Sequence, residues 1–440
     1  MPSANRRDFL QTSAAGAAAL STVAWAGIAQ AAPPEKIPVA LIGPGGMGNA
    51  HLATLLKNPR VQLTHICDVD SKRLAAAVKV AELAYGTAPQ AVTDMRQIFD
   101  DKNVVAVWNA TPDHWHAPAT ILACAAGKHV YVEKPCSHNL REGRLMIEAA
   151  RKYKRVVQQG TQSRSTAHVM HAMQRLKAGA IGNILVSKAW NSQMRGNIGH
   201  SKPGMAPPDY LNYDLWLGPA PETPYRKNML PGRWRWWQAF GTGDMGNDGV
   251  HDLDIARWGL GVTTHPSKIT ATGDKLFFDD DQQFPDTQYA VFEYPGDGAI
   301  GHKRQLVYEQ RIWSPYVQEG HENGNAYYGT EGMMIFGKKL GYKLYGRRNK
   351  LIEEVPATEV DLLAHHNNFL DCIASGERPN ADIEIGFLST SLCHLGNIAS
   401  RVGRVLHFDP QTEHITGDTE ADALLRREYR PGHWAVPSGV

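Results

Sequence analysis

A glycine-rich stretch near the N-terminus, GPGGMG at residues 43–48, has the spacing G-x-G-x-x-G. Glycines at these positions let the backbone turn tightly and approach a pyrophosphate, which then lies at the positive end of a following helix. An apolar run precedes the stretch, and a segment with helical apolar spacing follows it. In this context the motif predicts a dinucleotide site, with a purely structural glycine turn as the alternative.

Asp68 ends the next apolar run, twenty residues after the last glycine of the stretch. A carboxylate at this position accepts hydrogen bonds from the adenosine ribose hydroxyls, and its charge repels a 2′-phosphate. The pattern therefore favours NAD over NADP. Lys72 and Arg73 follow closely and weaken this preference, so NADP stays open.

Two further motifs, TPDHWH at residues 111–116 and EKP at residues 133–135, each follow an apolar run that predicts a strand. In open parallel sheets, ligands bind at the carboxyl ends of the strands, so both motifs are expected beside one pocket. Lys134 would face that pocket, where desolvation and a positively charged ring lower the pKa of a lysine. Pro135 fixes the backbone of Lys134, which argues against the alternative of a surface lysine.

The elements that must position these motifs alternate regularly along the first part of the chain. Strands are expected at 37–43, 61–70, 103–110, 128–135 and 155–160, and helices at 48–58, 71–83, 117–127 and 140–154. This alternation predicts an α/β fold for residues 37–160, with a doubly wound parallel sheet of the Rossmann type.

The rest of the chain, residues 161–440, has a different texture. Residues 195–243 are rich in Pro, Gly and Trp and are expected to form long surface loops. Strand-like runs separated by short turns fill residues 266–356, and helical segments follow at 359–376 and 383–403. These patterns predict an α+β domain with a large, open, mostly antiparallel sheet.

The glycine stretch, the ATPDHWH segment and the EKP tripeptide, in this order and spacing, resemble the Gfo/Idh/MocA family of dehydrogenases. Later marks of the family are GDMGNDGVHDLDIARW (243–258), GTEG (329–332) and HHNNFLDCIASGERP (365–379). The resemblance implies that His251 belongs to a substrate pocket and that copies of the chain pair through the open face of the second sheet. It also implies a set of residues that border the cofactor: Gly43, Gly45, Gly46, Met47, Gly48, Asp68, Thr111, Pro112, His116, Glu133 and Lys134.

The chain departs from the family at one position that matters for catalysis. Many members carry D-x-G-x-H, whereas Asn247 occupies the first position of this motif, and an amide cannot take up a proton. Acid–base work would then fall on His251 with help from Lys134, or on Asp248 or Asp254 if the local backbone shifts. A structural histidine at the start of a helix is the alternative for His251.

The segment RWRWWQAF at residues 233–240 stands just before this motif. Aromatic rings cover the apolar faces of sugars, and arginines hold hydroxyls or carboxylates, so the segment is a candidate substrate site. A hydrophobic plug is an equally good interpretation of any single tryptophan. The predicted substrate residues are Arg195, Trp234, Trp236, Trp237 and His251.

Composition limits the other classes of function. The 440 residues include 42% hydrophobic and 20% charged residues with a net charge of +2, which fits a globular protein with no preference for nucleic acid. The five cysteines are scattered without C-x-x-C spacing, and the H-x-H of residues 114–116 has no third ligand at zinc spacing. No metal is therefore expected, and the predicted partner is a small carbohydrate.

The first 32 residues resemble a twin-arginine export signal. Arg6 and Arg7 precede Phe9 and Leu10, and the uncharged segment that follows ends in an A-x-A pattern at residues 29–31. We expect cleavage and a periplasmic protein, with an uncleaved membrane anchor as the alternative. Because that pathway carries folded proteins, NAD is expected to be loaded before export.

These observations predict an NAD-dependent enzyme that transfers a hydride between tightly bound cofactor and a sugar or cyclic polyol. Two alternatives stay open. One is a glycosidase that acts by transient oxidation and elimination. The other is a binding protein that keeps the fold and binds NAD without turnover, and Asn247, whose amide cannot take up a proton, supports this alternative.

Overall fold

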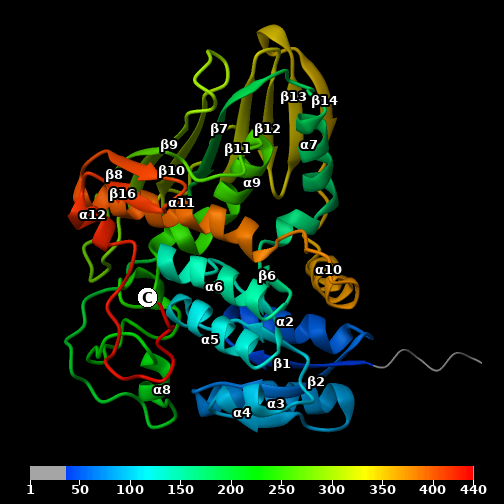
Figure 1. The fold of residues 1–440 in the computed structure, drawn as a ribbon, viewed down its shortest axis with the longest axis vertical. Helices are drawn as coiled ribbons and strands as arrows, with labels where there is room; N and C mark the ends of the chain where they lie inside the picture. The colour runs from blue at the N-terminus through cyan, green and yellow to red at the C-terminus, as the bar shows by residue number, and fades with distance from the viewer. Residues whose placement is uncertain (1–35, 440) are drawn as a thin grey trace, which may run out of the picture. The chain divides into compact units, whose positions relative to one another are not determined.

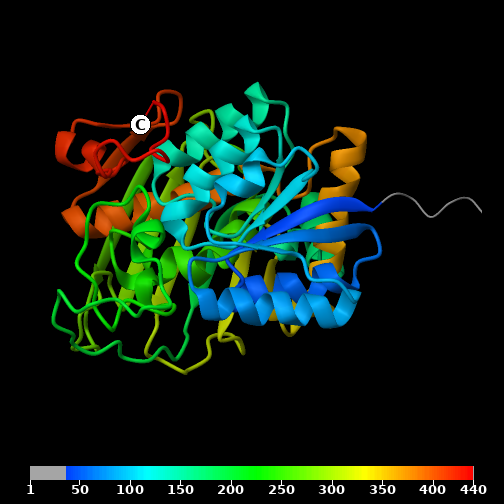
Figure 2. The same cartoon turned by 90° about the horizontal axis from the view of Figure 1, so that it is seen from below.

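The computed structural model describes residues 36–439, so the predicted export signal at residues 1–32 lies outside the described residues. Two sheets form the framework of the described part. Figure 1 shows the smaller sheet in blue and cyan and the larger one in green and yellow with its last two strands in orange to red, and Figure 2 shows both from below.

The smaller sheet is parallel throughout, in the order β3-β2-β1-β4-β5-β6 that defines a Rossmann fold. Its strands are β1 (Ile37–Ile42), β2 (Val61–Cys67), β3 (Gln90–Val92), β4 (Ala106–Asn109), β5 (His129–Val132) and β6 (Val157–Gln159). The helices between them are α2 (Gly46–Lys57), α3 (Ser71–Tyr85), α4 (Arg96–Asp100), α5 (Asp113–Ala125) and α6 (Leu140–Lys152). The predicted α/β fold of this part is confirmed.

Local chemistry sets the ends of α3, which follows the second strand. The Asp70 side chain accepts hydrogen bonds from the backbone N–H groups of Lys72 and Arg73, which otherwise have no partner in the first turn. The helix ends at Gly86, whose φ of +75° few residues other than glycine adopt readily. The chain therefore turns into this helix directly after the strand end that carries Asp68.

The larger sheet has ten strands in the order β14-β13-β12-β11-β7-β10-β9-β8-β15-β16. They are β7 (Ile184–Asn191), β8 (Lys268–Asp274), β9 (Thr287–Tyr294), β10 (Arg304–Arg311), β11 (Asn323–Gly329), β12 (Met333–Gly337), β13 (Gly341–Tyr345), β14 (Leu351–Val355), β15 (Leu406–Asp409) and β16 (His414–Thr416). Only β7 and β10 pair in parallel. The prediction of a large, mostly antiparallel sheet is confirmed.

Helices cover one face of the larger sheet. Helix α9 (Val250–Leu260) packs on β7 and β11, α11 (Ile383–Val402) packs on β8, and α7 (Ala167–Lys177) contacts β13. Helix α11 also contacts α6 of the Rossmann part, so it lies between the two sheets, as Figure 1 shows. Helix α10 (Leu362–Ser375) contacts α2 instead. Short helical segments complete the set: η1 (Gln162–Ser165), α8 (Tyr213–Leu217), η2 (Arg233–Trp236), η3 (Met245–Gly249), η4 (Arg347–Asn349) and α12 (Thr419–Ala423).

Residues 195–243, termed the cap segment, are more ordered than the surface loops that the sequence predicts. They contain two short helical turns, α8 and η2, and enclose a hydrophobic core separate from the main one. The side chains of this core are Ile198, Trp216, Leu217, Ala220, Met229, Trp234, Trp236, Trp237 and Phe240. The cap segment is therefore a small folded unit, because its tryptophans bury one another.

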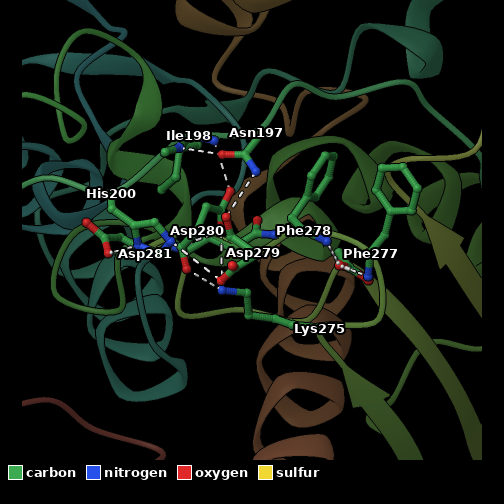
Figure 3. A network of polar contacts seen from close by, with 12 residues as sticks. Asn197, Ile198, His200, Lys275, Phe277, Phe278, Asp279, Asp280 and Asp281 are labelled. Carbon is green, nitrogen blue, oxygen red and sulfur yellow. Dashed lines mark hydrogen bonds and ion pairs between the residues drawn. The ribbon is translucent and has the colours of Figure 1, made fainter.

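Polar contacts fix the start of the cap segment to the loop that precedes β9, as Figure 3 shows. The Ile198 N–H donates to Asp280 Oδ2 (2.9 Å), and His200 Nδ1 lies 2.9 Å from Asp281 Oδ1. Lys275 Nζ lies 3.3 Å from Asp280 Oδ1 and balances its charge.

Within residues 36–439, no helix combines the length and the apolar character that a membrane span requires.

Candidate active site

The glycine loop joins β1 to α2 at one end of a cavity of about 470 Å³. Gly43 has a φ of +83°, and a Cβ on it would lie 2.7 Å from the carbonyl oxygen of Ala110. A Cβ on Gly48 would lie 2.0 Å from the carbonyl oxygen of Gly43, so Gly48 serves the close packing of the helix against the turn. A Cβ on Gly46 would meet no atom within 4 Å, and this residue lines the cavity with Gly45 and Met47. The loop thus has the open, donor-rich face that a pyrophosphate requires.

Asp68 lies directly after β2 and lines the same cavity. Its Oδ1 accepts a hydrogen bond from the backbone N–H of Asp70 (2.8 Å), which leaves the other oxygen for a ligand. Burial raises its pKa to about 6, against the opposing effect of that hydrogen bond and of Arg73. A ribose that donates to this carboxylate would favour its charged form. The glycine loop and Asp68 together fit NAD.

The residues of the 111–116 motif form the wall next to the glycine loop, with Thr111, Pro112 and His116 lining the cavity. His116 Nδ1 lies 2.6 Å from the carbonyl oxygen of Pro135, and its Nε2 lies 2.8 Å from that of Thr111. His114 Nε2 lies 2.9 Å from the carbonyl oxygen of Trp216 in the cap segment. These imidazoles connect loops to one another.

Across residues 36–439, no group of three or more His, Cys, Asp or Glu side chains is placed to hold a metal ion.

Glu133 lines the cavity at the end of β5 and is held by a buried histidine. His51 Nε2 lies 2.9 Å from Glu133 Oε1, and His51 Nδ1 lies 2.9 Å from Nε2 of His366. Burial alone would raise the pKa of Glu133. The hydrogen bond from His51 and the positive charges of His51 and Lys134 outweigh it and lower that pKa to about 2. Glu133 is therefore an anion beside Lys134. Sequence reasoning missed His51, although its place one turn into the helix after the glycine loop is a usable signal.

Lys134 and Asn247 meet at the far end of the cavity, and both line it. The ammonium of Lys134 donates a hydrogen bond to the main-chain oxygen of Asn247, which is 113 residues away in sequence. The structure thus brings the EKP motif and the 243–258 motif to one point. This contact places Lys134 beside the segment that carries Asn247 and His251, and the catalytic role of the lysine stays a prediction.

His251 lies on the first turn of α9, after a π-helical turn, η3, that spans Met245–Gly249. Such turns insert an extra residue and are frequent at functional sites. The imidazole is partly buried and makes no hydrogen bond with any residue between 36 and 439. Burial and the positive charges of Lys134 and Lys338 lower its pKa to about 3. His251 is therefore a neutral imidazole that can accept a proton.

Arg195 and Asp248 flank this end of the site without lining the cavity. Arg195 lies 3.2 Å from Asp244 Oδ1 and 3.7 Å from Asp248 Oδ2. Burial would raise the pKa of Asp248, but Lys338, His251, Lys134 and Arg195 lower it to about 2. Asp248 is thus a permanent anion near His251.

Gly48, Arg195 and His251 lie next to the cavity without lining it, and three further predicted residues are buried away from it. Asp254 is fully buried and receives two hydrogen bonds of 2.8 Å from Arg164 and one of 2.6 Å from Ser389, so its carboxylate is occupied by the core and cannot act as a base at the site. Trp236 and Trp237 are buried in the core of the cap segment, and only Trp234 of the three tryptophans lines the cavity. The hydrophobic-plug interpretation is correct for Trp236 and Trp237.

The cap segment roofs the nucleotide end of the cavity, which the sequence did not predict. Its residue Leu211 forms an antiparallel bridge with Asp70, and the backbone N–H of Asn212 donates to the carbonyl oxygen of Val69 (2.9 Å). Lys72 Nζ lies 4.1 Å from the centre of the Tyr210 ring. Further cavity-lining residues that sequence reasoning missed are Leu215, Trp216, Tyr225, Leu230, Arg235 and Trp434.

Comparison with known families decides the assignment. Residues 37–161 match the model of an oxidoreductase family with an NAD-binding Rossmann fold, and residues 186–436 match the model of its C-terminal alpha/beta domain. The chain belongs to the Gfo/Idh/MocA family. The predicted family and its cofactor NAD are thereby confirmed.

Individual relatives of this Gfo/Idh/MocA protein are distant. It is 29% identical to a levoglucosan dehydrogenase of Pseudarthrobacter phenanthrenivorans over 54% of its own length and 55% of the relative's. It is 27% identical to a glycosyl hydrolase family 109 protein of Saccharopolyspora erythraea over 41% of its own length and 44% of the relative's. The chain thus spans about half the length of these relatives. A solved levoglucosan dehydrogenase, in complex with NADH and levoglucosan, has the same fold, with a TM-score of 0.64, 20% identity, and coverage of 85% of this chain and 99% of that one.

Proposed function

We propose that this Gfo/Idh/MocA protein interconverts a ring hydroxyl and the corresponding carbonyl of a sugar or cyclic polyol, using NAD. The observation that carries the proposal is the meeting of Lys134 with the 247–251 segment at one end of the NAD cavity, beside a histidine that is neutral at neutral pH. The levoglucosan and inositol dehydrogenases among its relatives support the choice of a carbohydrate substrate.

Each residue has a definable task in this reaction. NAD, when bound, supplies the acceptor for the hydride that leaves the carbinol carbon. Lys134 donates a hydrogen bond to the hydroxyl oxygen and stabilises the negative charge that develops on it. His251 takes the hydroxyl proton and becomes an imidazolium, which the anion of Asp248 stabilises. The proton and the hydride thus leave in different directions, and a carbonyl forms.

A panel of sugars and cyclic polyols, added to purified protein with NAD, tests the proposal through the absorbance of NADH. We expect reduction with at least one member of the panel. No reduction with any sugar or polyol, together with normal NAD binding, contradicts the proposal and favours a binding protein without turnover.

A second candidate function is an NAD-dependent glycosidase, because family 109 glycosyl hydrolases are among the relatives. In such an enzyme the same residues would oxidise the sugar transiently, and elimination, water addition and reduction would follow. Aryl glycosides distinguish the two functions. Release of the aryl group without net accumulation of NADH supports the glycosidase, whereas NADH without release supports the dehydrogenase.

We further propose that the protein is exported by the twin-arginine pathway to the periplasm with NAD already bound. Arg6 and Arg7 with the uncharged segment behind them support export, and the cap segment over Val69–Lys72 supports slow release of NAD. Replacement of both arginines by lysine should strand NAD-loaded protein in the cytoplasm, as cell fractionation and nucleotide content would show. Export of the variant at the normal level contradicts this proposal.

We also propose a homo-oligomer that forms through the open face of the larger sheet. On this face Trp190, Ala326 and Ile335 form an apolar cluster, and Tyr289 and Tyr328 are each about 40% exposed. The strand register places the two tyrosines on the face opposite α9. Tyr328→Arg should lower the mass that light scattering measures after gel filtration, and an unchanged mass contradicts the proposed interface.

A further inference from the structure

The amide of Asn247 is held between an arginine and a buried carboxylate. Arg235 Nε donates to Asn247 Oδ1 (2.7 Å), and Asn247 Nδ2 donates to Asp244 Oδ1 (2.9 Å). A guanidinium only donates hydrogen bonds and an ionised carboxylate only accepts them. The amide oxygen of Asn247 must therefore face Arg235, and its amide nitrogen must face Asp244. Arg195 Nε, which donates to the same oxygen of Asp244 (3.2 Å), completes the arrangement.

An aspartate at position 247 does not fit this arrangement. Its second oxygen would take the place of Asn247 Nδ2 and lie 2.9 Å from Asp244 Oδ1, at a distance where two carboxylates share one proton. Asp244 is 1% exposed, so water cannot relieve the repulsion. Asp244 thus places a carboxylate beside the Asn247 amide, and Arg195 opposes the effect of burial, which raises the pKa of Asp244.

Charged groups of both signs surround Asp244. Arg195 faces Asp244 from the start of the cap segment, Arg235 faces it from η2, and Asp248 faces it from the following turn. The phenol of Tyr308 on β10 also lies near Asp244. An acid at position 247 would face Arg235 with one oxygen and Asp244 with the other, so repulsion from Asp244 would oppose the attraction of Arg235.

We propose that Asp244 and Asn247 form one positioning unit for Lys134, in which Asp244 provides the negative charge and Asn247 holds the lysine ammonium through its main-chain oxygen. The contact between Lys134 and that oxygen connects the unit to the reaction. The inference rests on the proposed oxidoreductase function and deepens it. The amide at position 247 then belongs to a working site and is no sign of lost activity.

Four proteins test the unit: the natural protein, Asn247→Asp, Asp244→Asn, and the exchange variant that carries both changes. Each single change should lower kcat about tenfold to a hundredfold, because the ammonium of Lys134 is displaced by a fraction of an ångström. Asn247→Asp should also add an ionisation to the pH profile of kcat. The exchange variant should recover most of the lost kcat, with KM for the sugar and NAD content close to those of the natural protein.

A cycle of unfolding free energies over the same four proteins, measured by chemical denaturation with NAD bound, gives a second readout. We expect the effects of the two single changes to be non-additive, with the exchange variant more stable than Asn247→Asp. If Asn247→Asp does not fold, an exchange variant that folds and binds NAD supports the unit, and failure of both overturns it. Additive stabilities, or an exchange variant as inactive as the single variants, also overturn it. Absence of hydride transfer in the natural protein overturns the proposed function instead, and the stability cycle then still decides the unit.

Discussion

The two ends of the cavity are built in different ways. The glycine loop and Asp68 of the nucleotide end come from one continuous piece of chain, in which β1, the glycine loop, α2 and β2 follow one another between residues 37 and 68, and the cap segment roofs them. The catalytic end is assembled from distant segments, because Lys134 follows β5 while Asn247 and His251 precede and begin α9. Changes at the nucleotide end should therefore alter cofactor binding, whereas changes at the catalytic end should alter turnover with the cofactor in place.

Lys134→Ala should have the largest effect and should separate the two ends most clearly. The side chain donates to the reacting oxygen in the proposed mechanism, so its loss should lower kcat about a hundredfold to ten-thousandfold. NAD content per chain should stay normal, since the glycine loop and Asp68 are untouched. Lys268→Ala, which removes a partly exposed lysine of β8 that pairs with Glu293 far from the cavity, is the matched control. Normal turnover in Lys134→Ala would remove this residue from the mechanism.

Asp68→Ala should weaken NAD binding roughly tenfold to a hundredfold, the effect of losing hydrogen bonds to a charged group. Calorimetric titration of cofactor-free protein measures the change. Without NAD, the thermal stability of the variant should match that of the natural protein. Burial raises the pKa of Asp68, so its charged carboxylate does not stabilise the fold. Equal losses of stability with and without NAD would show that Asp68 acts on folding.

Tyr210→Ala should have a smaller effect, on the rate at which NAD leaves. The ring packs against Lys72 at the place where the cap segment meets the nucleotide end, and such a contact contributes about 0.5 to 1 kcal/mol at an exposed site. We therefore expect NAD to dissociate about two- to fivefold faster, measured by dilution into an NAD trap. Tyr316→Ala, on an exposed loop elsewhere, should leave the rate unchanged. The same rate in both variants contradicts a retaining role of the cap segment.

The pH dependence should show the smallest change. The pKa of His251 is about 3 in the folded protein, below its ordinary value of about 6.5. The base therefore stays neutral between pH 5.5 and 7.5, and kcat/KM should not halve near pH 6.5. As the pH falls, His251 binds a proton near pH 6.5 in the unfolded chain but only near pH 3 in the folded protein. The contribution of this group to the free energy of unfolding is therefore complete above pH 6.5 and is lost as the pH falls toward 3. An acid limb centred near pH 6.5 would contradict the environment described for His251.

This difference between the two ends also explains what the sequence reveals. Gly43, Gly48 and Asp68 can be recognised from the sequence because they belong to one β-α-β unit. In such a unit the spacing of residues along the chain determines where they lie in the fold. The sequence does not reveal the role of Asp254, because its partner Arg164 lies ninety residues away and only packing shows that the pair belongs to the core. The sequence of the cap segment predicts a loop, because its core residues, several of them tryptophans, are irregularly spaced and leave no helical or strand period.

Transfer of a labelled hydride tests the central claim most directly. Purified protein is incubated with NAD and a panel of sugars and polyols that carry deuterium on their ring carbons, and the nucleotide released on denaturation is analysed by mass spectrometry. We expect NADH that has gained one deuterium with at least one member of the panel, and unlabelled NAD from Lys134→Ala under the same conditions. Protein that binds NAD but never returns labelled NADH with any sugar or polyol would contradict it.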